Sequence, residues 1–182
     1  MIRTANMKPT GKTEILIAAG LGLLMLGAFF SILGDARPWV IGLDEVNLLM
    51  HESGHVFFGS GGELVSALGG TAMQLIIPAA ICGYFVYKKD KTGLSFGIFW
   101  LGQNLVNIGV YVKDARTKLL PLVNGGTHDW DIILSKLNLL KLDSFLGNLV
   151  QTIGYLAMLA AIIMIGLWIF EKLKQITGKP LI

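Results

Sequence analysis

Residues 144–170, SFLGNLVQTIGYLAMLAAIIMIGLWIF, contain no charged residue and exceed the roughly 20 apolar residues that an α-helix needs to cross a bilayer. Three more stretches share this property: residues 15–34, 64–87 and 92–112. Of the whole chain of 182 residues, 53% is hydrophobic and 15% is charged, against about 25% charged residues in soluble domains, and the mean hydropathy is +0.65. The composition predicts an integral membrane protein, a multi-pass protein of the cell membrane whose main partner is the lipid bilayer.

A fifth segment, residues 39–59, follows Pro38 and is apolar apart from Asp44, Glu45 and Glu52. Because buried acids oppose insertion into lipid, this segment needs polar partners inside a helical bundle. We predict an all-α, polytopic membrane bundle that forms a single domain over residues 1–182. The expected transmembrane helices are at about 14–34, 39–59, 64–87, 92–112 and 143–171, with a short amphipathic helix near 128–140.

The unusual fifth segment contains the pentad His51-Glu52-Ser53-Gly54-His55, an HExxH motif. On a helix, two histidines four residues apart share one face and can reach the same Zn²⁺. The glutamate between them can accept a proton from water at the metal, as in zinc-dependent hydrolases. The motif therefore predicts His51 and His55 as metal ligands, Glu52 as the catalytic base and Zn²⁺ as the cofactor.

A catalytic zinc generally takes three protein ligands and keeps one open position, so the pentad needs another donor. Asp114, at the end of a predicted helix, is one candidate. His128 is the other, because it is the only remaining histidine and Asp129 or Asp131 could fix its tautomer. With five crossings, the pentad and both candidates fall on the side of the membrane that holds the N-terminus.

Other polar and small residues in the predicted helices suit a substrate cleft. Asn104 and Asn107 precede Asp114 on its helix and are predicted to bind substrate, with Gln103 beside them. Glycines 59, 61 and 62 are expected to break the helix after the pentad, and glycines 69 and 70 with Pro78 to disturb the next helix. Asp44 is on the stripe of His51 and His55, where it is either a relay group or an acid at the membrane surface.

An HExxH motif on a membrane helix, a glycine-rich following helix and a later aspartate resemble the site-2 protease family of intramembrane zinc metalloproteases. The resemblance covers roughly residues 39–116. It implies zinc held by His51, His55 and Asp114, water activated by Glu52, and a transmembrane segment as substrate. The chain departs from the family pattern where Asp114 is followed by Ala115, and the set of HESGH, KDAR and THDW is also similar to uncharacterised bacterial HExxH membrane proteins.

These observations favour an intramembrane zinc metallopeptidase that hydrolyses membrane-embedded or hydrophobic peptides. The alternative is a non-catalytic metal-binding membrane protein, or an assembly subunit of a membrane complex. Retention of Glu52 between the two histidines favours the enzyme, since a structural metal site needs no base there. Basic residues are few and scattered, so the sequence gives no support for nucleic-acid binding.

Overall fold

The computed structural model describes residues 11–123 and 127–178, and this part of the chain is helical with no β-strand. The helices are α1 (Gly11–Ile32), α2 (Leu43–Phe58), α3 (Glu63–Lys88), α4 (Lys91–Lys113), α5 (Asp129–Lys136) and α6 (Asp143–Thr177). Two 3₁₀ turns, Gly59–Gly61 and Leu140–Leu142, precede α3 and α6. The all-helical prediction is confirmed, and the short helix expected near 128–140 is α5.

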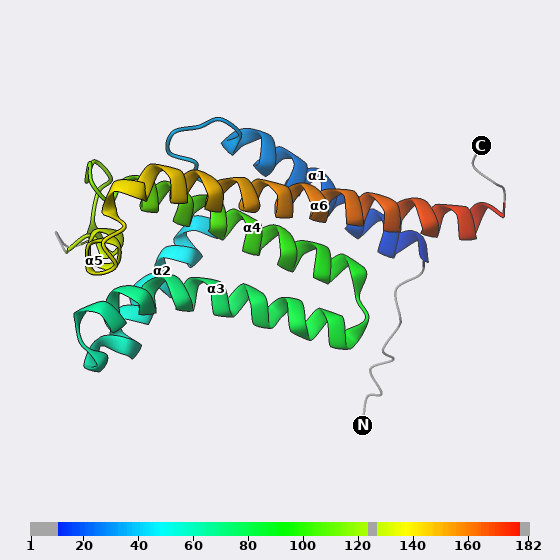
Figure 1. Ribbon diagram of the computed structural model, residues 1–182. Coiled ribbons are helices and arrows are strands. Elements are labelled where there is room, and N and C mark those ends of the chain that lie inside the picture. Colours follow the sequence, from blue (N-terminus) through cyan, green and yellow to red (C-terminus); the bar gives the residue numbers. More distant parts are fainter. Residues whose placement is uncertain (1–10, 124–126, 179–182) are drawn as a thin grey trace, which may run out of the picture.

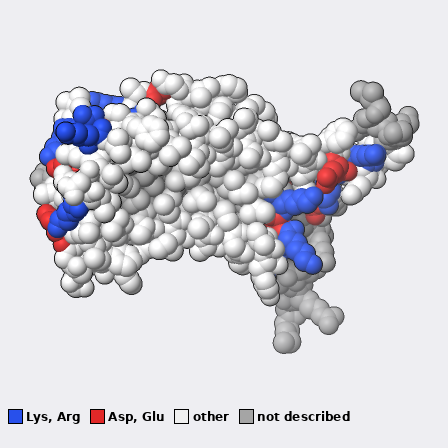
Figure 2. Space-filling model, in the orientation of Figure 1, with Lys and Arg blue, Asp and Glu red and all other residues white. Residues whose placement is uncertain are grey.

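Four long helices, α1, α3, α4 and α6, run side by side along the molecule (Figure 1). The start of α1 and the end of α6 lie at one end of this bundle, and α5 lies at the other. Three helical segments are long and apolar enough to cross a membrane, namely Gly11–Ile32, Glu63–Lys88 and Leu140–Thr177. On the face shown in Figure 2, charged side chains gather toward the two ends and leave an uncharged band between them. This distribution matches a bundle that spans a bilayer.

The prediction of five membrane spans is not supported, because α2 and α4 are not among the three segments that could cross a membrane and α2 does not cross the bundle. Its 16 residues extend only about 24 Å, less than the roughly 30 Å of hydrocarbon. The acids in its first turn shorten it: the Glu45 carboxylate accepts from the Gly42 N–H at 2.6 Å, and the Asp44 carboxylate accepts from the Val40 N–H. The N–H groups of Leu43 and Asp44 donate to the Val40 carbonyl, so the first turn of α2 is satisfied and the helix begins at Leu43.

A short α2 changes where the pentad lies. The helix stays in the half of the bundle nearest α5, and the chain turns at Gly59–Gly61 to begin α3 (Figure 1). The pentad therefore lies toward the end of the bundle opposite the start of α1, whereas five crossings would have placed it at the same end. The expected break at glycines 59–62 is confirmed. The expected disturbance of the next helix is wrong, since α3 continues through Gly69, Gly70 and Pro78.

Helix α4 is the central helix, packed against both α3 and α6. An added Cβ on Gly102 or Gly109 would lie 2.7 or 2.6 Å from a backbone oxygen of α6, so only glycine permits this approach. The polar side chains of Gln103 and Asn104 are 0% exposed. A helix with this composition can belong to a membrane bundle because protein, rather than lipid, surrounds its polar groups.

Candidate metal centre

The pentad is brought to its place by a close crossing of α2 and α3. An added Cβ on Gly54, inside the pentad, would lie 2.2 Å from the carbonyl oxygen of Gly69. An added Cβ on Gly70 would lie 2.8 Å from the His51 ring and 2.9 Å from the His55 ring. Gly70 therefore packs directly against both imidazoles, and Gly54 and Gly69 let the two backbones approach closely. The sequence alone did not show that these glycines pack against the pentad.

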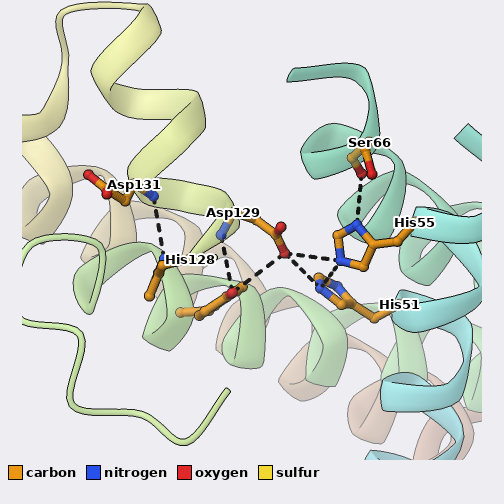
Figure 3. A network of polar contacts seen from close by, with 7 residues as sticks. His51, His55, Ser66, His128, Asp129 and Asp131 are labelled. Carbon is orange, nitrogen blue, oxygen red and sulfur yellow. Dashed lines mark hydrogen bonds and ion pairs between the residues drawn. The ribbon is translucent and has the colours of Figure 1, made fainter. Parts of the chain in front are cut away.

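Three potential metal-ligand atoms converge where the two helices cross, as Figure 3 shows. The Nε2 atoms of His51 and His55 are 3.1 Å apart, and the Asp129 Oδ2 lies 2.9 Å from the first and 3.2 Å from the second. Ligand atoms around a tetrahedral Zn²⁺ lie roughly 3.3 Å from one another, given metal distances of about 2.0–2.1 Å. The three atoms thus form a triangle close to the size that one ion requires.

The tautomer of His55 follows from its outer hydrogen bond. Its Nδ1 lies 2.9 Å from the carbonyl oxygen of Ser66 at the start of α3. A carbonyl can only accept, so Nδ1 carries a proton and Nε2 is the ring nitrogen that could bind a metal. The Asp129 carboxylate oxygen is a second potential ligand. A cation placed between these atoms would stabilise the arrangement.

Asp129 is the first residue of α5, and several contacts hold that helix in place. The Tyr111 hydroxyl of α4 accepts from the Asp129 N–H at 3.3 Å and lies 3.5 Å from the Asp129 Oδ2. Lys136 pairs with Glu63 of α3 at 2.9 Å. The start of α5 thus aims the Asp129 carboxylate at α2.

Asp114, predicted as a possible third ligand, lies instead at the end of α4, where its carboxylate organises the following loop. It accepts from the Thr117 hydroxyl at 2.6 Å and from the N–H groups of Leu119 and Leu120 at 2.8 and 2.9 Å. Burial opposes ionisation of Asp114, but these hydrogen bonds and the neighbouring His128 outweigh it and hold the pKa of the carboxyl below its usual range. The structure does not bring Asp114 to the histidine pair.

His128, the other predicted candidate, is the residue before α5 and faces away from the pair (Figure 3). Its Nδ1 accepts from the Asp131 N–H at 3.4 Å, and its Nε2 lies 3.4 Å from the Asp114 Oδ2. Burial lowers the pKa of His128 despite the nearby carboxylates, so the ring is neutral near pH 7. A neutral ring with Nδ1 as acceptor carries its proton on Nε2 and has no free lone pair for a metal. The donor that joins the pair is its neighbour in sequence, Asp129.

Glu52 lies where two cavities meet. The first, of about 310 Å³, is walled mainly by apolar side chains from the 37–39 segment, α2, α4 and the 120–123 segment. The second, of about 370 Å³, has polar walls that include Glu63, Ser66, Thr127 and Asp129. Both include His51 and Glu52. Glu52 therefore borders both an apolar and a polar cavity.

The asparagines predicted to bind substrate lie in or beside a buried polar network between α2 and α4. Asn104 is 0% exposed and donates to the backbone carbonyl of Trp100, so it does not reach either cavity. Asn107 lines the apolar cavity and donates to the Asp44 Oδ1. The Gln103 amide also donates to this oxygen, at 2.8 Å. Asp44 is 2% exposed, so its side chain is enclosed by protein and does not extend to solvent.

The donor set and its surroundings fit a divalent ion. Two imidazoles and one carboxylate are ligands that Zn²⁺ accepts, and three protein donors leave a position open. Among the described residues, the group His51, His55 and Asp129 is the one in which three potential ligand atoms all lie within 4.8 Å of one another. Sequence reasoning placed Asp129 near the site only as a helper of His128. The sequence feature that could have identified Asp129 is its position in the first turn of a helix, close to a second acid, Asp131.

Comparisons of the chain with models of known protein families, with curated proteins and with solved structures found no match. The assignment of function therefore rests on the geometry of the site.

Proposed function

We propose that this protein is a multi-pass membrane zinc metallopeptidase that hydrolyses hydrophobic or membrane-embedded peptides, with His51, His55 and Asp129 as the zinc ligands. The observation that carries the proposal is the convergence of three ligand atoms within 3.2 Å of one another, on a cavity whose wall also includes Glu52. The ligand set differs from the one implied by the site-2 protease resemblance, in which Asp114 would hold the ion.

A bound Zn²⁺ supplies Lewis acidity, which makes a water molecule acidic near neutral pH and polarises a peptide carbonyl. Glu52 lies beside the ligands and accepts the proton as the water oxygen forms a bond to the carbonyl carbon. The carbon–nitrogen bond then breaks, and Glu52 returns the proton to the leaving amine. The products are a carboxylic acid and an amine, and no further reactant is needed.

The two cavities suit the two reactants. The polar cavity reaches Glu52 from the side of Glu63 and Thr127 and would admit water. The apolar cavity reaches the same residue from the side of Leu48 and Leu122 and would hold apolar side chains of the substrate. The Ser66 carbonyl fixes the His55 ring, and Tyr111 holds the start of α5, so both act as positioning residues.

Metal analysis of the purified, detergent-solubilised protein, combined with Glu52→Gln, tests this function. We expect one zinc per chain in both forms and cleavage of quenched fluorescent hydrophobic peptides by the wild type only. Glu171→Gln is the matched control, because this exposed glutamate pairs with Lys91 at the opposite end of the bundle. Zinc bound by both forms without peptide cleavage by either would favour a non-catalytic metal-binding protein. Absence of zinc from the wild type would overturn both functions.

A further inference from the structure

The apolar cavity carries one feature that hydrolysis alone does not require. Arg37 lies on its wall and is the one lysine or arginine among the described residues that line it. The Arg37 backbone N–H donates to Asp35 at 3.0 Å, but its guanidinium makes no hydrogen bond or ion pair with any residue in the described ranges 11–123 and 127–178. Arg37 is an exposed residue, so its guanidinium is accessible to an anionic group at the edge of the apolar cavity.

The acids on the same cavity wall do not supply that anion. The Asp44 carboxylate is buried and accepts from Asn107 and Gln103 of α4 and from the Val40 N–H. Glu52 lies beside His51 on the inner wall shared with the polar cavity. The positive charge of Arg37 thus remains available to a molecule that occupies the cavity.

The mouth of the cavity faces outward through apolar side chains. Trp39 and Leu48 both line the cavity and are 53% and 42% exposed. Close to them in the chain, Ile41 and Leu49 are 88% and 71% exposed. Tryptophan and arginine side chains together are typical of the boundary between the apolar and polar layers of a membrane. An occupant can therefore reach the cavity from the bilayer with a charged group left at the boundary.

We propose that the substrate is a hydrophobic peptide segment with an acidic residue that pairs with Arg37, while neighbouring apolar side chains fill the cavity that leads to His51 and Glu52. This inference rests on the proposed peptidase function and names the substrate class of that site. The volume of about 310 Å³ is in the range of cavities that bind ligands and accommodates a few apolar side chains. Charge complementarity selects the peptide, and the apolar walls contribute most of the binding.

Three quenched fluorescent peptides that differ only in one residue flanking an apolar segment, Asp, Asn or Lys, test the inference. Their binding is measured in neutral detergent with the zinc-loaded Glu52→Gln protein, and their cleavage with the wild type. We expect the Asp peptide to bind about fivefold more tightly than the Asn peptide, the effect of one partly exposed ion pair, and the Lys peptide to bind most weakly. Arg37→Glu in the same background reverses the order of the Asp and Lys peptides.

Lys141→Glu is the matched control, because it makes the same change of charge at an exposed residue in the turn before α6, outside the cavity. It should keep the wild-type order. An unchanged order in Arg37→Glu, an equal change in both variants, or no peptide binding overturns the inference. A wild type that binds the Asp peptide selectively but cleaves no peptide overturns the proposed function instead, since that result concerns catalysis and leaves the recognition by Arg37 intact.

Discussion

Helix α2 carries two polar clusters about two turns apart, and they differ in how their hydrogen bonds are satisfied. Around Asp44, each carboxylate oxygen meets a donor: Gln103 and Asn107 for one oxygen, and the Val40 N–H for the other. Around His51 and His55, the Asp129 carboxylate meets the Nε2 atoms of both rings, while the His55 Nδ1 donates to the Ser66 carbonyl. The first cluster joins two helices through hydrogen bonds, whereas the second brings together three atoms that could hold a metal ion.

The comparison distinguishes a polar cluster that joins two helices from one whose atoms could hold a metal ion. Buried polar groups in a native protein normally find partners, and a metal ion would be a common partner for two imidazoles and a carboxylate. Both clusters use acids that are costly to bury in a membrane protein. The Asp44 cluster compensates that cost by joining α2 to α4, and the His51 cluster would compensate it by binding metal.

The largest expected effect is that of Asp129→Asn on metal affinity. The amide is a far poorer zinc ligand than the carboxylate, so we predict a loss of more than about a hundredfold, or more than about 2.7 kcal/mol, in zinc affinity. Competition with a chromophoric chelator measures it. Asp131→Asn, in the same turn but paired with Lys118, is the control and should change zinc affinity less than about threefold. Equal affinities in Asp129→Asn and the wild type would remove Asp129 from the ligand set.

At Asp44 we expect a loss of stability with little change in zinc affinity. Asp44→Ala leaves the amides of Gln103 and Asn107 buried without their acceptor, which destabilises the protein by about 2 kcal/mol. Thermal unfolding in detergent should show a lower midpoint, while the folded protein binds zinc within about threefold of the wild type. A large loss of zinc affinity without a loss of stability would mean that Asp44 belongs to the metal site. Asp44→Asn, which keeps one acceptor oxygen, should lie between Asp44→Ala and the wild type.

A smaller effect on the metal site is expected from Gly70→Ala. The new methyl group would lie within 2.9 Å of both imidazole rings, so the rings must shift and the donor triangle must distort. We predict a loss of zinc affinity of about tenfold, comparable to the loss of a group that orients a metal ligand. Gly83→Ala on the same helix is the matched control, since nothing lies within 4 Å of its added Cβ. Equal affinities in the two variants would contradict the packing of His51 and His55 on Gly70.

The smallest effect is expected at Asp114, which shapes the loop after α4. Asp114→Asn weakens the hydrogen bonds to the Leu119 and Leu120 N–H groups and should destabilise the protein by about 1 kcal/mol, with little change in zinc affinity. Because folding lowers the pKa of Asp114, its contribution is present above the ordinary aspartate value and is lost as the pH falls below about 4. Unfolding midpoints of the wild type and the variant should therefore converge at acidic pH. A constant difference across this range would contradict the assigned role.

Hydropathy was enough to predict the four long helices, because stretches without charge over a membrane-spanning length have few alternatives. It failed at α2, where the length depends on whether Asp44 and Glu45 face lipid or satisfy the backbone N–H groups of Val40 and Gly42. That choice depends on three-dimensional contacts with α4, which the sequence does not display.

The pentad could likewise be found from sequence, since its spacing defines a helical face. The third donor could not be chosen, because Asp114 and His128 have suitable chemistry but are occupied elsewhere. Asp114 binds the backbone of its own loop, and the His128 ring accepts from the Asp131 N–H. Only the position of α5 against α2 and α3 shows that Asp129 is the residue that points at the pair.

X-ray absorption at the zinc edge of the purified, zinc-loaded protein tests the central claim most directly. The account predicts four-coordinate zinc with two imidazole nitrogens and the remaining ligands oxygen, at about 2.0–2.1 Å, and loss of this spectrum in Asp129→Asn. Failure to bind zinc, or an identical spectrum in wild type and Asp129→Asn, would contradict it.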